Sequence, residues 1–396
     1  MRRAAIGRAV AVAAFVVVVL GVTAVPASAH ASLVSVDPQP GGVYDESPSA
    51  INLRFNEPVE IALGGVRVFD GDGARVDAGA PTHPGGRGAE VRTSLPDLDD
   101  GTYAVTWRVT SADAHPIEGA FTFQVGPEAT VTNADGLAAR LLAKQGGSAV
   151  VGVVYAIGRA AVYAALALLV GGVAFLVVAF REGRGMRRAA RVVWTGWGVL
   201  AVATIVGVGL EGVYAAALPL SKVVDLSVWG DVLDTRYGKV ALLRLALLVV
   251  AIPLVRMLLR SDRKLPRWWS LPAVVVGVGL AATPGLGGHA STGEYVGLAL
   301  VSDTLHVLAM ACWLGGLVML VAIVLVRPLP AGLRRAINRF SAVALGAVAV
   351  LVLTGGFQAW RQVGSIDALR DTDFGRLLLA KLVVFAAIMV AAAFSR

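Results

Sequence analysis

The sequence predicts two domains of different fold class: an all-β sandwich of Ig-like or Greek-key type, followed by an all-α membrane domain of about seven helices. The chain of 396 residues is 56% hydrophobic and only 16% charged, too apolar for an ordinary soluble protein. Residues 30–144 carry 8 Lys and Arg against 16 Asp and Glu, whereas residues 145–396 carry 24 against 11. Short alternating runs before this boundary and long apolar stretches after it complete the prediction.

Residues 1–29 have the features of a cleaved signal peptide. Three arginines precede an apolar run at 9–22, and small residues at 27–29 end the segment. Cleavage after Ala29 makes His30 the new N-terminus. Its α-amine and imidazole can then hold one metal ion together, and this donor pair suits Cu(II). The alternative is that His30 follows the cleavage site by chance.

Residues 30–125 have the pattern of short β-strands. Apolar and polar side chains alternate at 50–55 and 103–109, and the run at 66–69 ends in the turn-forming sequence Asp-Gly-Asp-Gly. This pattern predicts a small antiparallel sandwich or barrel. Residues 126–147 are predicted to be a linker.

A second candidate metal-binding element lies in the last part of this domain, at Asp113-Ala-His115-Pro116. In an extended chain, residues i and i+2 point to the same side, so Asp113 and His115 can present a carboxylate and an imidazole together. With His30 they would complete a mononuclear site. Taken alone, Asp113 is also a common turn residue, and His115 is equally well explained as an exposed loop residue before proline.

The second part of the chain, 148–396, contains seven apolar stretches that are each long enough to cross a bilayer. They lie near 150–180, 192–218, 239–259, 268–285, 298–326, 340–360 and 375–394. Arginine and lysine gather in the first, third and fifth of the loops that join these stretches. The positive-inside rule assigns those loops to the cytoplasm, which places the β domain outside, as a signal peptide requires.

Two glycine pairs occupy matching positions in the first and fifth spans, Gly171-Gly172 and Gly315-Gly316. Together with a second similarity between segments 235–245 and 372–382, they suggest two parallel three-helix units joined by the fourth span.

Four polar or polarisable residues share one face of the fifth span: Asp303, His306, Met310 and Trp313, at 3-4-3 spacing. Ionisable groups inside a membrane are costly and usually belong to a pathway or site. His289, at the outer end of the fourth span, is placed to join them. Imidazoles and a thioether can hold copper, and Met310 would favour Cu(I). The alternative is a structural Asp–His hydrogen bond, with Met310 packing between helices.

Other intramembrane charges are Glu211, Arg159 and Arg244. Helix pairing or snorkelling explains each of them at least as well as transport does. The single cysteine, Cys312, can form no internal disulfide.

The first domain resembles the copper resistance CopC family over its whole length. The matching motifs are His30-Ala-Ser-Leu, Asp37-Pro38, Gly41, Pro48, Ile51-Asn-Leu-Arg-Phe55-Asn-Glu57-Pro58-Val59, Asp113-Ala-His115-Pro116 and Gly119-Ala-Phe121-Thr-Phe123-Gln-Val125. The membrane part is similar to the CopD family through Gly288-His289-Ala290, Asp303-Thr-Leu-His306 and Trp313-Leu-Gly-Gly316.

This resemblance to CopC–CopD fusions implies a sandwich that binds Cu(II) through His30, Asp113 and His115, with Glu57 as a candidate neighbour. It implies that the helical domain takes part in copper import and homeostasis, with Cu(I) or Cu(II) passing along His289, Asp303, His306 and Met310. Some CopC proteins have a methionine-rich Cu(I) site, but no methionine lies between His30 and Gly126. We therefore expect one Cu(II) site in the sandwich and no separate Cu(I) site.

The predicted protein is not an enzyme, and its partners are copper ions and the lipid bilayer of the plasma membrane. The charge distribution gives no reason to expect nucleic acid as a partner, and the sequence leaves open whether copies form a homo-oligomer. Two other functions are compatible with the residues. One is a copper chaperone or sensor that is anchored without transport. The other is a histidine-brace oxidase or monooxygenase, which a carboxylate from Asp113 in the copper plane disfavours.

Overall fold

The computed structural model describes residues 31–111, 115–126, 134–145, 147–260, 265–292, 295–324 and 332–363, and four single residues beyond them, Arg376, Leu379, Ala380 and Val383. Residues 31–354 form one compact unit, and the described residues from Gly355 onward belong to a second. The predicted signal peptide, His30, Asp113 and almost all of the predicted seventh span lie outside the described residues.

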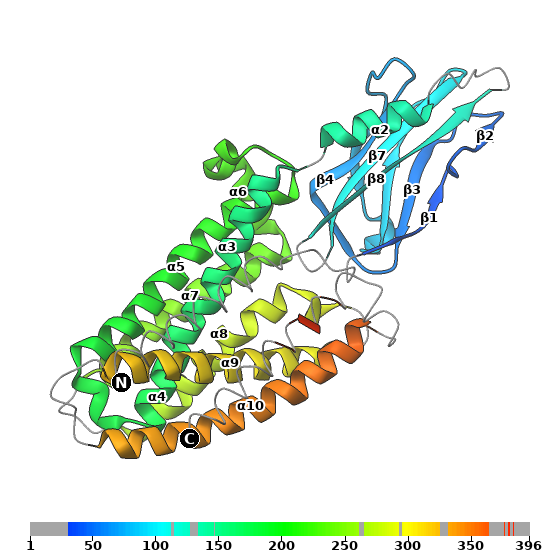
Figure 1. Ribbon diagram of the computed structural model, residues 1–396. Coiled ribbons are helices and arrows are strands. Elements are labelled where there is room, and N and C mark those ends of the chain that lie inside the picture. The colour runs from blue at the N-terminus through cyan, green and yellow to red at the C-terminus, as the bar shows by residue number, and fades with distance from the viewer. Residues whose placement is uncertain are drawn as a thin grey trace. The chain divides into compact units, whose positions relative to one another are not determined.

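The first domain is a sandwich of two four-stranded sheets, which Figure 1 shows as two layers of arrows. One sheet has the order β1-β3-β6-β5 and the other the order β2-β8-β7-β4. The described strands are β1 (Leu33–Asp37), β2 (Val43–Tyr44), β3 (Ala50–Phe55), β4 (Val59–Phe69), β5 (Ala78–Thr82), β6 (Glu90–Ser94), β7 (Gly101–Ser111) and β8 (Pro116–Val125), with a short turn η1 (Pro84–Gly86) before β6. All described pairings are antiparallel except that of β2 with β8. The predicted all-β sandwich is confirmed.

The alternation in the sequence places the core between the two sheets. In β3, Ile51, Leu53 and Phe55 are 0, 1 and 2% exposed, while Arg54 between them is exposed. The Phe55 ring meets Trp107 of β7 edge to face, with centroids 5.5 Å apart, so the two sheets interlock through aromatic side chains. A rigid core of this kind holds the strand ends, and the loops between them, in fixed positions.

The segment predicted to be a linker contains a helix, α2 (Ala134–Gln145). It packs against β7 and β8, and Ala138 is buried there. Part of this segment therefore belongs structurally to the first domain, because a helix with small apolar residues can cover one face of the sheet.

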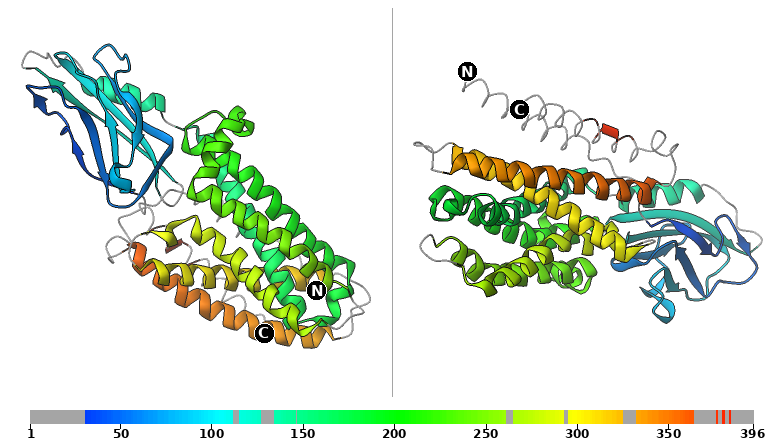
Figure 2. Two further views of the ribbon diagram at one scale, coloured as in Figure 1. Left: turned by 180° about the vertical axis from the view of Figure 1, so that it is seen from behind. Right: turned by 90° about the horizontal axis from the view of Figure 1, so that it is seen from below.

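Six described helical segments are long and apolar enough to cross a membrane, and they coincide with the first six predicted spans. The chain is thus a multi-pass membrane protein. Figure 2 shows the helices from two further sides. The described helical elements are α3 (Ala149–Leu166), η2 (Ala167–Gly171), α4 (Gly172–Val178), η3 (Arg181–Gly185), α5 (Arg187–Ala215), η4 (Leu220–Val224), α6 (Leu226–Asp234), α7 (Arg236–Leu258), η5 (Arg267–Trp269), α8 (Ser270–Leu286), η6 (His289–Ser291), α9 (Val296–Val324) and α10 (Leu333–Val363).

Two of the arginine-rich loops lie at the same end of the bundle. Arg335, at the start of α10, has its Nη1 4.0 Å from Oε1 of Glu182 in η3. This proximity agrees with the alternation of spans that the sequence predicts, in which the loops after the first and fifth spans face the same side.

The matching glycines of the first and fifth spans meet in the structure. Gly171, the last residue of the π-helical turn η2, would place an added Cβ 1.9 Å from the carbonyl oxygen of Ala311. Gly315 would place one 1.9 Å from the carbonyl oxygen of Ala167. The two helices therefore cross backbone to backbone, an approach that only residues without a side chain allow.

We expect Gly171→Val to destabilise the helical domain severely, because its side chain would collide with the backbone of α9. The matched control is Gly198→Val in α5, where an added Cβ meets no atom within 4 Å. The measurement is the thermal unfolding midpoint of the purified chain in detergent, together with its yield from membranes. Equal midpoints for the two variants would contradict the close crossing.

Candidate functional site

The strand topology brings three chain segments together at one end of the sandwich. Val59 at the start of β4 pairs with Ser111 at the end of β7, and Thr110 pairs with Pro116 at the start of β8. Residues 112–114 lie outside the described residues, but the chain on both sides of them is held together: the amide and the hydroxyl of Ser111 each donate to the carbonyl of His115 at 2.9 Å. His115 thus lies at this end of the sandwich, directly before β8.

The start of the described chain is attached to the same end. The amide of Ser32 donates to Oδ1 of Asn56 at 2.7 Å, and the amide of Asn56 donates to the carbonyl of Ser32 at 3.1 Å. Asn56 precedes Glu57, whose carboxylate oxygen Oε1 is shielded from solvent in the link between β3 and β4. Ala31 is buried beside them. The described neighbours of His30 and of Asp113 therefore gather at the end that holds Glu57 and His115.

Among the described residues, no group of three or more His, Cys, Asp or Glu side chains is arranged to hold a metal ion. Two of the three predicted sandwich ligands, His30 and Asp113, lie outside the described residues, so the ligand set remains a prediction. What the described residues contribute is an imidazole and a carboxylate at one end of a rigid sandwich.

The His115 ring lies against the helical domain, within the same compact unit. Nη1 of Arg159 in α3 is 3.4 Å from Nε2 of His115. The ring of Tyr214 in α5 meets the imidazole edge to face at a centroid distance of 6.4 Å, and it stacks on Tyr155 of α3 at 4.7 Å. The predicted copper ligand of the sandwich is therefore in contact with side chains of two membrane spans, Arg159 of α3 and Tyr214 near the end of α5.

Arg108 of β7 fastens the sandwich to the end of α5. Its Nε donates to the carbonyl of Ala215 at 2.7 Å and its Nη2 to the carbonyl of Tyr214 at 3.1 Å, while Nη1 pairs with Glu118 of β8. The last carbonyls of a helix have no partner within the helix and carry partial negative charge, so a guanidinium is well suited to them. Sequence reasoning missed Arg108, because a single arginine in a strand carries no sign of the helix it will meet.

A cavity of about 110 Å³ lies beside this contact. Val59 and Ser111 of the sandwich and Glu211 and Tyr237 of the helices are among the residues that line it. Glu211 is only 1% exposed. Glu211, whose presence in the membrane the sequence explains by helix pairing, thus borders the space between the end of the sandwich and the helices.

In the predicted membrane pathway, His306 of α9 is bonded to Thr354 of α10. Nδ1 of His306 lies 2.9 Å from Oγ1 of Thr354, and this hydroxyl in turn donates to the carbonyl of Val350 at 2.6 Å. Because the threonine proton is directed to that carbonyl, the threonine oxygen accepts from the histidine Nδ1–H. With the proton on Nδ1, a metal ion would have to bind His306 through Nε2.

The other pathway residues have different neighbours. Asp303 packs against α8, because a Cβ added at Gly285 would lie 2.4 Å from Oδ2 of Asp303. Met310 is half-buried against the apolar core of the bundle, as the packing interpretation requires. His289 begins η6 at the end of α8, and its side chain lies outside the described residues. The described contacts do not join these residues into one cluster, and their role in a pathway stays a prediction.

Comparison with known proteins accounts for both domains. Family profiles match residues 33–126 as a CopC domain, 148–299 as a copper resistance protein D-like N-terminal domain and 334–396 as copper resistance protein D. The copper resistance protein C of Pseudomonas syringae pv. tomato is 34% identical over 106 residues, which are 25% of this chain and 82% of that protein. The chain belongs to the CopC–CopD fusion family.

This CopC–CopD fusion is also similar to a longer protein, the copper transport protein CutJ of Bacillus subtilis (strain 168). The two are 25% identical over 379 residues, and the match covers 91% of this chain and 66% of that protein. The fusion therefore spans about two thirds of that relative's length. Among solved structures, CopC from Methylosinus trichosporium OB3b has 30% sequence identity and matches 26% of this chain and 99% of its own, with a TM-score of 0.24.

Proposed function

We propose that this fusion captures Cu(II) outside the plasma membrane with its sandwich and passes copper to its helical domain for import. In this proposal the sandwich holds one Cu(II) ion through His30, Asp113 and His115, with Glu57 beside them, and the domain has no separate Cu(I) site. The domain boundaries that go with it are a signal peptide at 1–29, the CopC-like sandwich at 30–125, a connecting segment at 126–147 and the CopD-like membrane domain at 148–396.

The observation that supports delivery best is the contact of His115 with the helices. A ligand that only stored copper could sit anywhere on the sandwich surface, whereas His115 lies 3.4 Å from Arg159 and against Tyr214. An ion released at this position would leave the sandwich beside α3 and the end of α5. Transfer between two fixed sites needs no diffusion of free copper, which favours a fusion of the two domains over separate proteins.

The charge of the loops supports the orientation. Arginine-rich segments follow the first, third and fifth spans, so the opposite ends, and with them the sandwich, belong outside. The proposal further routes copper along His289, Asp303, His306 and Met310, because imidazole, carboxylate and thioether groups can all bind copper.

Arg108→Gln tests delivery through the described contact. The variant removes the guanidinium that donates to the carbonyls of Tyr214 and Ala215, but it leaves every proposed copper ligand in place. We expect cells at limiting copper to accumulate several-fold less copper with this variant than with the wild type. The expected Cu(II) affinity of the purified chain is unchanged, which shows that the sandwich is folded.

The matched control is Arg67→Gln, an exposed arginine on β4, which should accumulate copper like the wild type. Wild-type accumulation by Arg108→Gln, at equal protein in the membrane, would argue for a binding protein whose sandwich works independently of the helices. Peroxide formation by the copper-loaded chain in the presence of ascorbate would instead favour the oxidase alternative.

A further inference from the structure

We propose that the helical domain binds one anionic phospholipid in an apolar groove between α4 and α8. In this proposal an acyl chain fills the groove, and the phosphate of the lipid lies at the mouth of the groove, among the arginines of two loops. The site lies in the leaflet on the side of those loops. The inference does not depend on the route that copper takes.

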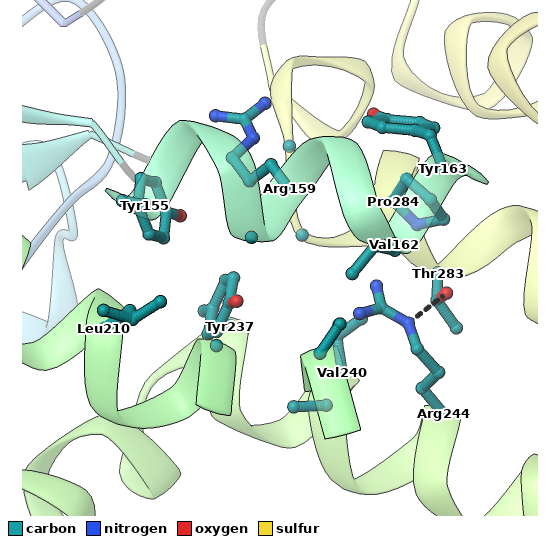
Figure 3. Close-up of a pocket in the computed structure, with 16 residues that line it drawn as sticks. Tyr155, Arg159, Val162, Tyr163, Leu210, Tyr237, Val240, Arg244, Thr283 and Pro284 are labelled. Atoms are coloured by element: carbon teal, nitrogen blue, oxygen red, sulfur yellow. Dashed lines mark hydrogen bonds between the residues drawn. The ribbon is translucent and has the colours of Figure 1, made fainter. Parts of the chain in front are cut away.

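The bundle contains two spaces of opposite character. The first, of about 60 Å³, is polar, and Figure 3 shows Tyr155, Arg159 and Arg244 around it. Nε of Arg244 donates to Oγ1 of Thr283 at 2.8 Å, and the buried carboxylate of Glu211 acts on both Tyr155 and Arg159. The polar groups around this cavity are thus engaged with one another.

The second space is a groove of about 300 Å³ whose lining residues are apolar except for Ser270. The helices α4 and α8 both pack against α9, and the groove lies between them. Small residues on both walls, including Ala174, Ala273 and Gly277, leave this space open. A groove of this composition suits a hydrocarbon chain and offers nothing to a polar ligand.

The groove is closed on the inside and open on the outside of the bundle. Leu169 and Leu280 of its lining are buried, whereas Val178, Val274 and Val278 on its rim are exposed. Exposed valines on membrane spans face lipid, so the groove opens toward the acyl chains of the bilayer.

The length of the groove corresponds to one leaflet. Its lining on α8 extends from Ser270 to Leu280, about 15 Å at 1.5 Å per residue. This is half of the ~30 Å hydrocarbon core. Trp269, at the same end as Ser270, is fixed there because its Nε1 donates to the carbonyl of Leu254 at 3.0 Å. An acyl chain that enters at this end would therefore reach the middle of the membrane.

The loops at the mouth of the groove are strongly basic. Residues 181–191, which follow α4, contain five arginines and one acidic residue, Glu182. Residues 256–267, which lead into α8, contain five arginines or lysines and one aspartate. Oε1 of Glu182 already lies 4.0 Å from Arg335 of α10. The excess of positive charge favours an anionic headgroup over a zwitterionic one.

One arginine stands at the mouth on each wall. Nε of Arg181 donates to the carbonyl of Val177 at 3.1 Å, and the carbonyl of Arg267 accepts from Oγ of Ser270 at 3.0 Å. Val177 and Ser270 both line the groove. Both arginines are exposed, and neither forms an ion pair within the described part of the chain. A guanidinium binds a phosphate through paired hydrogen bonds, so the two arginines suit a lipid phosphate at this position.

The test titrates phosphatidylglycerol and phosphatidylcholine with the same acyl chains into the delipidated full chain in detergent and follows thermal unfolding. A ligand that binds only the folded state raises the unfolding midpoint with saturation. We expect half-saturation by phosphatidylglycerol at a concentration at least about fivefold lower than by phosphatidylcholine. Native mass spectrometry should show one phosphatidylglycerol retained by each chain. Sodium phosphate alone should leave the midpoint unchanged.

Gly277→Leu tests the groove. A Cβ added at Gly277 meets only Cγ1 of Val170, at 3.9 Å, so a leucine has room there and takes the place of the acyl chain. We expect this variant to fold but to lose both the retained lipid and the shift of the midpoint. The matched control is Gly198→Leu in α5, where an added Cβ meets no atom within 4 Å, and it should respond like the wild type.

Arg267→Gln tests the headgroup and should raise the half-saturating concentration of phosphatidylglycerol about fivefold. Its control is Arg339→Gln, an exposed arginine of α10, a helix that contributes no described residue to the groove. This control should bind phosphatidylglycerol like the wild type.

Equal half-saturating concentrations of the two lipids would overturn the inference, because ordinary contact with the bilayer shows no preference for charge. Retained phosphatidylglycerol in Gly277→Leu would place the lipid elsewhere. A wild-type chain that retained none would show that the groove is not a lipid site. A full shift with sodium phosphate would assign the effect to the arginines without the groove. If Gly277→Leu did not fold, Arg267→Gln would decide, since unchanged half-saturation in that variant contradicts the proposed position of the phosphate.

Discussion

A chain that keeps one extra residue before His30 should bind Cu(II) at least about 100-fold more weakly than the mature chain. Loss of an outer-shell partner costs a metal site up to about 100-fold in affinity, and loss of a direct ligand should cost at least as much. In the extended form the α-amine becomes a peptide nitrogen and no longer offers a lone pair. The structure attaches this part of the chain firmly, because Ser32 is bonded to Asn56 beside Glu57 and Ala31 is buried. A new terminus at residue 30 would therefore directly precede a part of the chain that is held in place.

Competition titration of the purified chain against a chelator of known affinity measures this effect. His115→Ala should shift or bleach the d-d absorption band of the bound Cu(II). His83→Ala should leave the band unchanged, because His83 lies before β6 and its Nδ1 is 2.7 Å from the carbonyl of Glu90. Equal affinity of the extended and mature forms would show that the terminal amine is not a ligand and that the motif Asp113-Ala-His115 binds without it.

Replacing His306 by alanine should reduce cellular copper accumulation at limiting copper to near the level of cells without the protein. The expectation rests on the hydrogen bond between Nδ1 of His306 and the Thr354 hydroxyl, which holds the imidazole in one orientation inside the bundle. Removing the imidazole removes this donor from the interior of the membrane, where no water can replace it. The Cu(II) affinity of the sandwich should remain unchanged in this variant.

Thr354→Val is the matched variant for His306→Ala. It removes the same hydrogen bond between α9 and α10 but keeps the imidazole. Copper accumulation well above that of His306→Ala is the result expected for a pathway residue. If both variants lost accumulation equally, or if His306→Ala accumulated copper like the wild type at equal protein, His306 would have to be assigned to helix packing.

The sequence by itself was sufficient for the two fold classes and for the positions of six membrane spans. Both depend on local patterns: the alternation through Ile51, Leu53 and Phe55 selects a strand with one buried face, and about 20 consecutive apolar residues select a membrane helix.

Only the tertiary structure decided which residues from distant parts of the chain meet. Arg108 and the last carbonyls of α5 are more than 100 positions apart. Arg244, which the sequence leaves open to helix pairing or snorkelling, lines a cavity together with Tyr155 of another helix. Asp303 and His306 share a helix face in sequence, yet one packs on α8 and the other bonds to α10, because side chains three residues apart on a helix point about 60° apart and can meet different neighbours. Side-chain periodicity determines which face of an element is buried. The partner on that face is set by the packing of the whole chain, and the chemistry of the site depends on that partner.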